Sequence, residues 1–584
     1  MIEPKYATLQ TLFADRVFRI PRYQRFYSWQ TRQREDLFSD LKKLAERGND
    51  NHHFMATVVC HRTSEIKSVG ATEYRIYDIV DGQQRLTTLI LILKCIELAL
   101  EKGSEERHEL AKTIVKRDGN LILLQTNNVN EHIFNAFLRE GREPNEDAIR
   151  THADRTLATG IMECKNFVYN WSGERGGPMS LLRLVQNKLG FVVYDTEDSR
   201  IVYSIFEVLN SRGLAVDWLD KCKSILMGKA FELSANEAAA EATIQTLQNL
   251  WSNIYSEMAH VDVSGQEILR VTATLYYGAS QGKPQRADEA LELFRNECND
   301  ADKPRQIAEK IFNVTQKLVS LEKNKFLGPV VKVLQARILA VAIDSTACLS
   351  DKERENALAQ WERVTFRIYG LFRKDSRTKV GDYIRLAAKI TKQEEGMSRY
   401  SEIMQGLRDL GSEYPIENAV NEGLEGKNCY EDSDICRFIL WRYEEQLARI
   451  AGRGATIDEH VRRDVWQLRA SDSIEHIFPQ TPEQGGAWDG KMHRGDEQTE
   501  EHGRHVNRIG NLILLPILLN QEAKRSGFKS KIDVYKRHRL RMIQEVLETK
   551  DGAERIQWTL AEIEERERDI VDWAKSEWAD LGAD

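Results

Sequence analysis

The feature that most constrains this fold is a predicted strand that leads, within a few residues, into a strongly apolar helix. Residues 74–80 have the β-branched and aromatic content of a strand, and residues 86–100 are apolar at most positions of a helical segment. The segment between them, Asp81–Arg85, reads Asp-Gly-Gln-Gln-Arg. The pattern predicts a tight strand-to-helix turn at Asp81–Arg85.

The residue types in this turn suit a phosphate-bearing ligand. Gly82 lets the backbone approach a phosphate, and the helix N-terminus after it supplies free N–H groups. Arg85 can add a bidentate cation, and Asp81 can hold a metal ion or a water. Gln83 and Gln84 can orient water or bind a base. No Walker-type loop occurs in the sequence. A tight turn closed by an arginine ion pair explains the same residues equally well.

An arginine-rich segment lies before this turn. Residues 16–34 contain six arginines and no acidic residue, and aromatic side chains are interleaved with them. Tyr23, Gln24 and Arg25 lie at its centre. Such a segment can bind phosphates and stack on bases. A buried aromatic cluster with arginines on the surface is an equal alternative.

A polar segment, residues 206–213, ends a predicted helix over 201–209 and contains Asn210 and Arg212. Alone, it is typical of a polar helix C-terminus. If it folds back onto Asp81–Arg85, Asn210 and Arg212 would join the same site. Strands are also predicted at 54–60 and 191–194.

Length and composition indicate a multidomain globular protein. With 584 residues the chain exceeds a single core, so two to four domains are expected. Residues 235–450 show only helical periodicity, with a predicted loop at Gly411–Lys427, and Ser172–Pro178 is predicted to be a polar loop. The eight cysteines form no C-x-x-C pair, which indicates buried thiols and not a zinc or disulfide framework.

Charge and hydropathy limit the partners. The net charge is −8, so DNA binding would need local basic patches. No apolar run reaches the roughly 18 residues that span a bilayer, and the first residues carry no signal pattern. We therefore expect a cytoplasmic protein without a membrane partner.

Near the C-terminus, an acid and a histidine are adjacent at the end of an apolar strand. Residues 473–479 contain Glu475 and His476, and residues 507–512 contain Asn511 after a loop. A second apolar run and a predicted helix with Asn520 follow. This order is similar to an HNH-type (ββα-metal) nuclease site.

The chemistry of phosphodiester cleavage fits these residue types. A base must activate water, and a cation must stabilise the phosphate. His476 is the candidate base, because an imidazole titrates near neutral pH. Glu475 and Asn520 offer oxygen ligands for Mg²⁺ or Mn²⁺, and Asn511 is expected to hold the imidazole by a hydrogen bond. An exposed strand end explains the acid–histidine pair alone, but the ordered set favours a nuclease.

A basic run follows this motif. Residues 521–542 contain eight Lys and Arg residues against two acids. A patch of this kind beside the site can bind phosphates. We expect DNA contacts from Arg508, Lys524, Arg525 and Lys529, while a solvated basic face is the alternative.

Together, these segments resemble a known family. Residues 20–29, 79–89 and 206–213, with Asp220 and Lys223, look like the N-terminal DGQQR domain of GmrSD-type restriction enzymes. The segments around Glu475–His476 and Asn511 look like the C-terminal HNH domain of that family. Single-chain BrxU- and SspE-like members combine both domains.

The resemblance implies a multidomain, predominantly helical α+β protein. It implies a ParB-like α/β domain over 1–234 and an HNH (ββα-metal) nuclease domain over 455–584. The helical middle region over 235–454 is predicted from its periodicity, and no family motif covers it.

The resemblance also implies roles for residues. Nucleoside triphosphate would bind and be hydrolysed at Asp81–Arg85, and Tyr23–Arg25 would help to read a mark on DNA. Glu475, His476, Asn511 and Asn520 would carry cutting, although most HNH sites have a histidine where Asn520 stands.

We therefore expect a nucleotide-dependent DNA endonuclease of antiphage defence that acts on modified or phosphorothioate DNA. Its expected cofactors are Mg²⁺ or Mn²⁺ and a nucleoside triphosphate, with GTP as the first choice, and a homodimer is left open. A nucleotide-gated DNA sensor with a vestigial nuclease site and an RNA-targeting nuclease are the alternatives.

Overall fold

A computed structural model describes most of the chain. It describes residues 4–14, 16–46, 53–69, 72–116, 121–126, 129–198, 201–202, 205, 217–278, 282–323, 333–394, 396–452, 465–466, 470–482, 493–494 and 497–582. The chain forms two compact units: unit 1 comprises residues 1–278 and 285–320, and unit 2 comprises residues 279–284 and 321–584. The helical region predicted over 235–454 is therefore shared between both units.

A mixed six-stranded sheet lies at the centre of unit 1, in the order β1-β6-β3-β4-β2-β5. The pairs β6–β3, β4–β2 and β2–β5 are parallel, while β1–β6 and β3–β4 are antiparallel. The strands are β1 (Lys5–Thr8), β2 (Arg16–Ile20), β3 (His53–Val69), β4 (Thr72–Asp81), β5 (Leu124–Thr126) and β6 (Leu189–Thr196).

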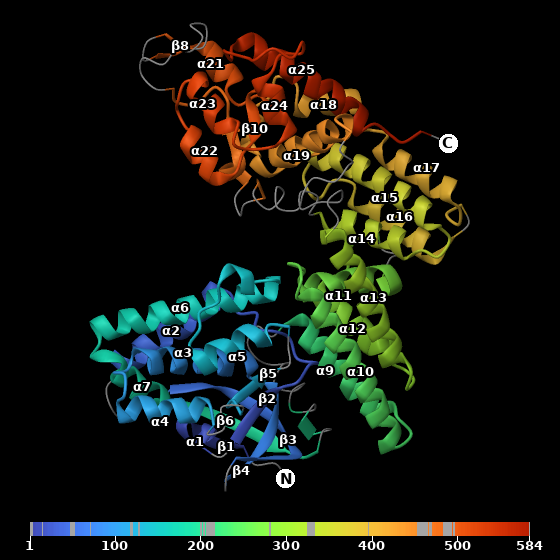
Figure 1. Cartoon of the computed structure of the whole chain (residues 1–584). Coiled ribbons are helices and arrows are strands. Elements are labelled where there is room, and N and C mark those ends of the chain that lie inside the picture. Colours follow the sequence, from blue (N-terminus) through green and yellow to red (C-terminus); the bar gives the residue numbers. More distant parts are fainter. Residues whose placement is uncertain are drawn as a thin grey trace. The chain divides into compact units, whose positions relative to one another are not determined.

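Helices cover this sheet and extend unit 1 beyond it (Figure 1). Those that follow the strands are α1 (Leu9–Phe13), α2 (Thr31–Glu46), α3 (Gln83–Ala99), α4 (Glu105–Ile114), α5 (Glu131–Glu140), the 3₁₀ turn η1 (Glu146–Ala148), α6 (His152–Glu174) and α7 (Gly177–Lys188). A second group contains α9 (Trp218–Leu233), α10 (Glu237–Met258), α11 (Gly265–Ala273), the π-helical turn η2 (Thr274–Gly278), α12 (Ala287–Glu297) and α13 (Lys303–Lys323).

Helix α3 explains why the strand-to-helix turn organises unit 1. Nearly all of its side chains are buried, and it packs against α4, α6 and α7. Its apolar residues would be exposed on every side if the helix lay at the surface, so the sequence requires a covered, central position.

Unit 2 begins with a helical group and ends with the segment that carries His476. The helical group contains α14 (Leu334–Ser345), α15 (Asp351–Thr365), the π-helical turn η4 (Phe366–Leu371), α16 (Val380–Lys392), α17 (Tyr400–Gly411), α18 (Ile416–Gly423), η5 (Cys429–Glu431) and α19 (Ser433–Ile450). The following elements are η6 (Ala470–Ser473), β7 (Ile474–His476), β8 (His493–Arg494), β9 (Glu497–Gln498), α21 (Glu500–His505), η7 (Ile509–Asn511), β10 (Leu512–Leu514), α22 (Ile517–Ala523), α23 (Phe528–Tyr535), α24 (Arg541–Leu547) and α25 (Leu560–Glu577).

The predominantly helical α+β prediction is confirmed. The predicted strands at 54–60, 74–80 and 191–194 lie within β3, β4 and β6, and every named element from α10 to α19 is helical. The loop prediction for Gly411–Lys427 is wrong, because the segment contains α18, an eight-residue amphipathic helix that buries Ala419 and Val420. The loop predicted at Ser172–Pro178 is also mostly helical, since α6 ends at Glu174 and α7 begins at Gly177.

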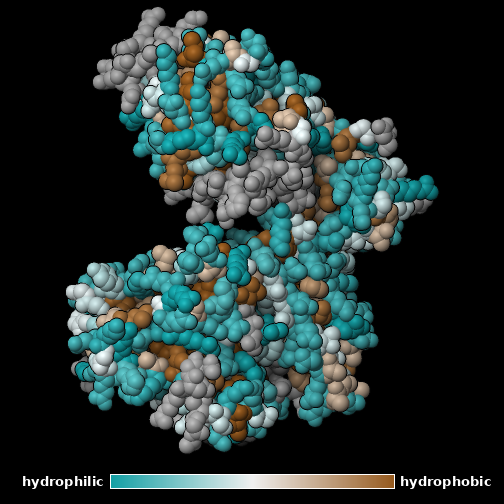
Figure 2. Space-filling view, in the orientation of Figure 1, coloured by the Kyte–Doolittle hydropathy of each residue, from teal (hydrophilic) through white to brown (hydrophobic). Residues whose placement is uncertain are grey.

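The surface agrees with the composition. Figure 2 shows a mainly hydrophilic face on which hydrophobic residues lie in small groups. Within the part of the chain that the structure describes, no helix has the length and apolar character needed to cross a membrane. All eight cysteines are free thiols, and seven of them are buried.

Candidate functional site

The acid–histidine motif lies on a short two-stranded sheet in unit 2. Strand β7 pairs antiparallel with β10, so that His476 lies opposite Leu512 and Glu475 opposite Ile513. Helix α22 begins three residues after β10. The strands form because Ile474, Leu512 and the residues around them are buried in the core of unit 2.

His476 is a buried imidazole with one defined partner. Its Nε2 lies 2.9 Å from Oδ1 of Asn507. Because an amide oxygen only accepts hydrogen bonds, Nε2 carries the proton and Nδ1 keeps a lone pair. The ring of Tyr430 lies edge-on against the imidazole, with ring centroids 4.6 Å apart. Burial lowers the pKa of His476 to about 4, and Lys531 and His502 add to this effect, so the ring is neutral at pH 7.

Asn511 does not hold the imidazole, contrary to the prediction. Its Nδ2 donates to the carbonyl oxygens of Phe478 and Val506, at 2.9 and 2.8 Å, and its Oδ1 accepts from the backbone N–H of Phe478 at 2.8 Å. Trp558 Nε1 also donates to this oxygen. Asn511 therefore fixes the backbone that follows His476, and Asn507 takes the role that was expected of Asn511.

Glu475 lies in a buried ion pair. Lys531 Nζ donates to its Oε1 at 2.6 Å, Tyr535 OH donates to the same oxygen at 2.9 Å, and Lys531 also donates to the carbonyl oxygen of His476. Burial raises the pKa of Glu475 and lowers that of Lys531, while their contact opposes both shifts. Neighbouring residues of a strand face opposite sides, so Glu475 and His476 contact different surroundings.

Asn520 is anchored through its nitrogen. Nδ2 donates to the carbonyl oxygens of Asp472 at 2.9 Å and Ile474 at 3.2 Å. Its Oδ1 accepts no hydrogen bond from any described residue, and the Asp472 carboxylate has no described partner either. These two groups are oxygen donors that the protein leaves available close to β7.

The basic run is divided between surface and interior. Lys524, Arg525 and Lys529 are exposed. Arg508 instead pairs with Glu567 at 3.2 Å, and Lys531 forms a buried ion pair with Glu475. The exposed cations remain available for phosphate, whereas Arg508 would first have to leave Glu567.

In unit 1 the strand-to-helix turn forms where the sequence predicts it. Gly82 has φ +94°, and a Cβ atom there would lie 3.3 Å from the carbonyl oxygen of Thr57. Asp81 Oδ1 accepts from the Gly82 backbone N–H at 2.8 Å. Burial raises the pKa of Asp81, and Asp220 adds to this shift.

The two glutamines of the turn, Gln83 and Gln84, differ in their hydrogen bonds. Gln84 holds the chain over 26–28, because its Oε1 accepts from Ser28 N at 2.9 Å and its Nε2 donates to Phe26 O at 3.0 Å. Both of its polar groups are used inside the protein, which does not fit the predicted nucleotide contact. Gln83 Oε1 is buried and has no hydrogen-bond partner among the described residues.

Arg85 is the half-buried cation of the turn. Its guanidinium makes no hydrogen bond or ion pair with any residue that the structure describes, although Asp81 and Asp40 lie within electrostatic range. Burial lowers its pKa. An incompletely compensated guanidinium beside a helix N-terminus is suited to an anionic ligand.

A buried ionic cluster lies next to the turn. Lys223 Nζ donates to Asp220 Oδ1, Gln24 Oε1 and the carbonyl oxygen of Tyr23, at 3.0 to 3.1 Å. Arg25 pairs with Asp220 at 3.1 Å, and Tyr255 OH donates to Asp220 at 2.8 Å. The cluster therefore joins the segments around Tyr23 and Asp220, and Asp220 lies within electrostatic range of Asp81.

This cluster uses Gln24 and Arg25 inside the fold, so they are not available for the expected DNA contact. Phe18 and Tyr27 are buried in the core of unit 1, and Arg34 is buried against Glu163. The buried aromatic cluster of the alternative therefore describes this segment, but of its arginines only Arg22 and Arg32 are exposed. Asn210 and Arg212 lie outside the described residues.

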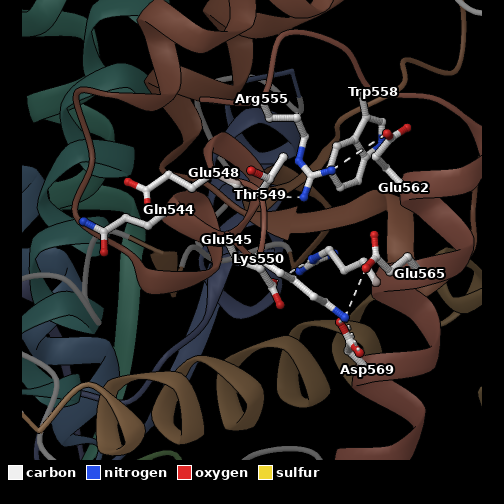
Figure 3. Close-up of a pocket in the computed structure, with 11 residues that line it drawn as sticks. Gln544, Glu545, Glu548, Thr549, Lys550, Arg555, Trp558, Glu562, Glu565 and Asp569 are labelled. Carbon is white, nitrogen blue, oxygen red and sulfur yellow. Dashed lines mark hydrogen bonds and ion pairs between the residues drawn. The ribbon is translucent and has the colours of Figure 1, made fainter. Parts of the chain in front are cut away.

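A cavity of about 210 Å³ lies elsewhere, between α24 and α25 (Figure 3). Figure 3 shows Lys550 pointing to Glu565 and Asp569, with ion pairs of 3.1 and 2.9 Å. The lining carries five acids and three basic residues. A cavity with this excess of negative charge does not suit a phosphate, and none of the predicted site residues line it.

Three functional contacts were missed in the sequence. Asn507 was visible as the first residue of the segment 507–512, but spacing does not reveal which asparagine faces the ring. Asp472 directly precedes the motif, but a single acid there gives no signal of its own. The Lys531–Glu475 pair gave none because the two residues lie on different elements, α23 and β7.

Comparison with known proteins identifies both ends of the chain. Residues 9–227 match the family model of the GmrSD restriction endonuclease N-terminal domain, and residues 414–573 match that of the GmrSD restriction endonuclease C-terminal domain. No curated protein matches the chain. Both matches occur in the expected order and together cover more than half of the sequence. The chain therefore belongs to the GmrSD restriction endonucleases, and its substrate is DNA.

Proposed function

We propose that this protein cuts DNA at His476, in an HNH-type site, under the control of a nucleoside triphosphate bound near Arg85. The observation that carries the nuclease part is the imidazole of His476. It is neutral, it is held through Nε2 by Asn507, and its Nδ1 lone pair is left for a water. The order β7, β10, α22 supports a ββα arrangement around it.

The residues around His476 fit a magnesium-type ion better than zinc. The described residues contain no group of three or more His, Cys, Asp and Glu side chains that could hold a metal. Mg²⁺ commonly uses only one or two protein oxygens and completes its shell with water and phosphate. Asn520 Oδ1 and the Asp472 carboxylate are the candidate donors, whereas Glu475, the other metal ligand expected from the sequence, is buried against Lys531 and Tyr535. When bound, such an ion would stabilise charge on the phosphate and the leaving oxygen.

The role of each protein group follows from its position. Nδ1 of His476 takes the proton of the attacking water, and the Asn507 contact fixes the ring through Nε2 so that Nδ1 keeps its lone pair. Asn511 keeps the following backbone in place, and Lys531 neutralises Glu475. Lys524, Arg525 and Lys529 supply phosphate contacts at the surface.

The nucleotide part rests on Arg85. A half-buried guanidinium without a described partner, next to the free N–H groups of the α3 N-terminus, is suited to a phosphate. Lys223 and Asp220 form the buried support beside it. The ParB-like character of unit 1, the preference for GTP and the recognition of modified DNA remain part of this proposal.

Plasmid nicking by His476→Ala tests the nuclease assignment. We expect loss of nicking in Mg²⁺ or Mn²⁺ by at least about 100-fold, because the general base is removed, while nucleotide hydrolysis is unchanged. Nicking at the wild-type rate would refute the assignment. If the wild type itself nicks DNA with none of the nucleotides, the result supports the alternative of a DNA sensor with a vestigial nuclease site. An RNA substrate in the same assay tests the other alternative, an RNA-targeting nuclease.

A further inference from the structure

A polar groove runs along one side of helix α10 in unit 1. One cavity, of about 580 Å³, lies between the segment around Arg22 and the helix residues Gln245, Asn249 and Asn253. A second, of about 330 Å³, shares Arg22 and Ser252 with the first. The two cavities are therefore neighbours and form one groove that is bounded on one side by α10.

The α10 side of this groove is an uncharged amide and hydroxyl face. It consists of residues at helical spacing: Gln245, Gln248, Asn249, Ser252, Asn253 and Ser256. The opposite face of α10 is buried through Ile244, Leu247 and Trp251. Residues 242–256 contain no charged side chain, although 30% of the chain is charged. A helix face that only contacts solvent can carry charged side chains without cost. A face that binds the uncharged hydrogen-bonding groups of a ligand is better built from amides and hydroxyls.

The cation of the groove is Arg22. It is exposed and makes no hydrogen bond or ion pair with any residue in the described part of unit 1. Arg19 also lines the groove, but it is neutralised by Asp78 at 2.6 Å and Glu65 at 2.7 Å. One acid, Glu131, lines the second cavity. In the first cavity Arg22 is the cation that has no ion pair with any described residue, and it lies beside a row of hydrogen-bonding groups.

This chemistry matches a DNA strand better than a free nucleoside triphosphate. A triphosphate would place several negative charges against a single free guanidinium. A strand places one phosphodiester there and offers base edges, which Asn and Gln side chains bind well. The face from Gln245 to Ser256 is about 16 Å long, which is close to the rise of about five base steps of B-DNA and longer than one nucleotide needs.

We propose that the groove between Arg22 and the amide face of α10 binds a strand of the DNA substrate, with a phosphate on Arg22 and bases against Asn249 and Asn253. The proposal rests on the DNA substrate of the family and is independent of the role of His476. It places DNA contacts on a helix that none of the motifs includes, and it replaces Gln24 and Arg25 as the contacts expected in this part of unit 1.

DNA binding by the full chain in EDTA tests the proposal without any cutting. The probe is a fluorescein-labelled 20-nucleotide DNA, as a single strand and as a duplex, in an anisotropy assay. We expect Asn249→Asp combined with Asn253→Asp to raise Kd by at least about tenfold, because carboxylates repel phosphate and lose the amide donors. Arg22→Gln should raise Kd and reduce the salt slope by about one.

Matched controls separate this site from general charge effects. Gln266→Glu changes an exposed amide on the neighbouring helix α11, and Arg183→Gln removes an exposed arginine on α7; both should stay within about twofold of the wild type. Test variants that bind DNA as tightly as these controls would overturn the proposal. So would variants that lose binding of free GTP while they keep DNA affinity. If the asparagine pair lowers the melting temperature, Arg22→Gln decides the outcome.

Discussion

The contact between His476 and Asn507 is the residue-level feature on which the proposed chemistry depends. The 2.9 Å hydrogen bond fixes both the tautomer and the plane of a ring that also packs edge-on against Tyr430. A base that is neutral and oriented before the substrate arrives needs no reorganisation during proton transfer. Asn507 is therefore a positioning residue.

Replacing Asn507 should affect the rate of cutting more than binding. We expect Asn507→Ala to lower kcat by about 10- to 100-fold with little change in KM, the usual cost of losing a group that orients a catalytic histidine. Asn507→Asp keeps an acceptor and adds a negative charge. It should retain more activity and shift the acid limb of the pH–rate profile upwards. Equal losses in both variants, with unchanged pH profiles, would argue for a purely structural role.

The low pKa of His476 makes a prediction about stability. The pKa is about 4 in the folded chain and about 6.5 in an unfolded chain. As the pH falls below about 6.5 the unfolded state takes up a proton first, so the free energy of unfolding falls. Between pH 7.5 and 4.5 this group alone should cost about 2 kcal/mol.

Denaturant unfolding of the wild type and His476→Gln at both pH values checks this prediction. The variant cannot take up this proton, so the stability difference between it and the wild type should shift in its favour by about 2 kcal/mol at the lower pH. A difference that does not change with pH would show that the imidazole is not desolvated.

At the scale of elements, the strand-to-helix turn is held by the backbone conformation of Gly82. Its φ of +94° is strained for any residue with a Cβ, and that Cβ would also press on the backbone of β3. Gly103 offers a matched comparison, because it has φ +92° but nothing within 4 Å of an added Cβ.

We expect Gly82→Ala to destabilise unit 1 by about 2–3 kcal/mol, since backbone strain and close contact act together. Gly103→Ala should cost about 1–2 kcal/mol through strain alone. Thermal unfolding of both variants measures the difference, and nucleotide hydrolysis should fall only in Gly82→Ala. Equal stability of the two variants would show that the close approach of an added Cβ to Thr57 and Val58 of β3 has no energetic cost.

The sequence predicted these elements where local pattern and burial coincide. The strands β3, β4 and β6 and helix α3 were predictable, because their apolar residues have no alternative to the core. Helix α18 was not, because its short pattern lies among glycines and polar residues. The sequence predicted which segments form the site around His476, but it did not predict which side chains contact one another there. Whether Asn507 or Asn511 meets the imidazole, and that Lys531 neutralises Glu475, depends on packing between distant elements.

At the scale of the whole molecule, each unit carries a candidate site for phosphate chemistry. Unit 1 has a guanidinium without a described partner at Arg85, supported by the cluster around Lys223. Unit 2 has the neutral imidazole of His476. A restriction endonuclease must cut foreign DNA and spare the DNA of its own cell. We propose that nucleotide binding in unit 1 controls when the site in unit 2 cuts. The account requires that a change at Arg85 alters cutting without any change at His476.

The most direct measurement is the nicking rate of plasmid DNA in Mg²⁺, with and without GTP or ATP, on unmodified, glucosylated and phosphorothioate DNA. We predict that a nucleoside triphosphate changes the rate of the wild type at least about tenfold, an effect worth about 1.4 kcal/mol. Arg85→Ala should still nick DNA but lose this response, and Arg183→Ala should retain it. A wild-type rate that is independent of nucleotide, or a full nucleotide response in Arg85→Ala, would contradict the account.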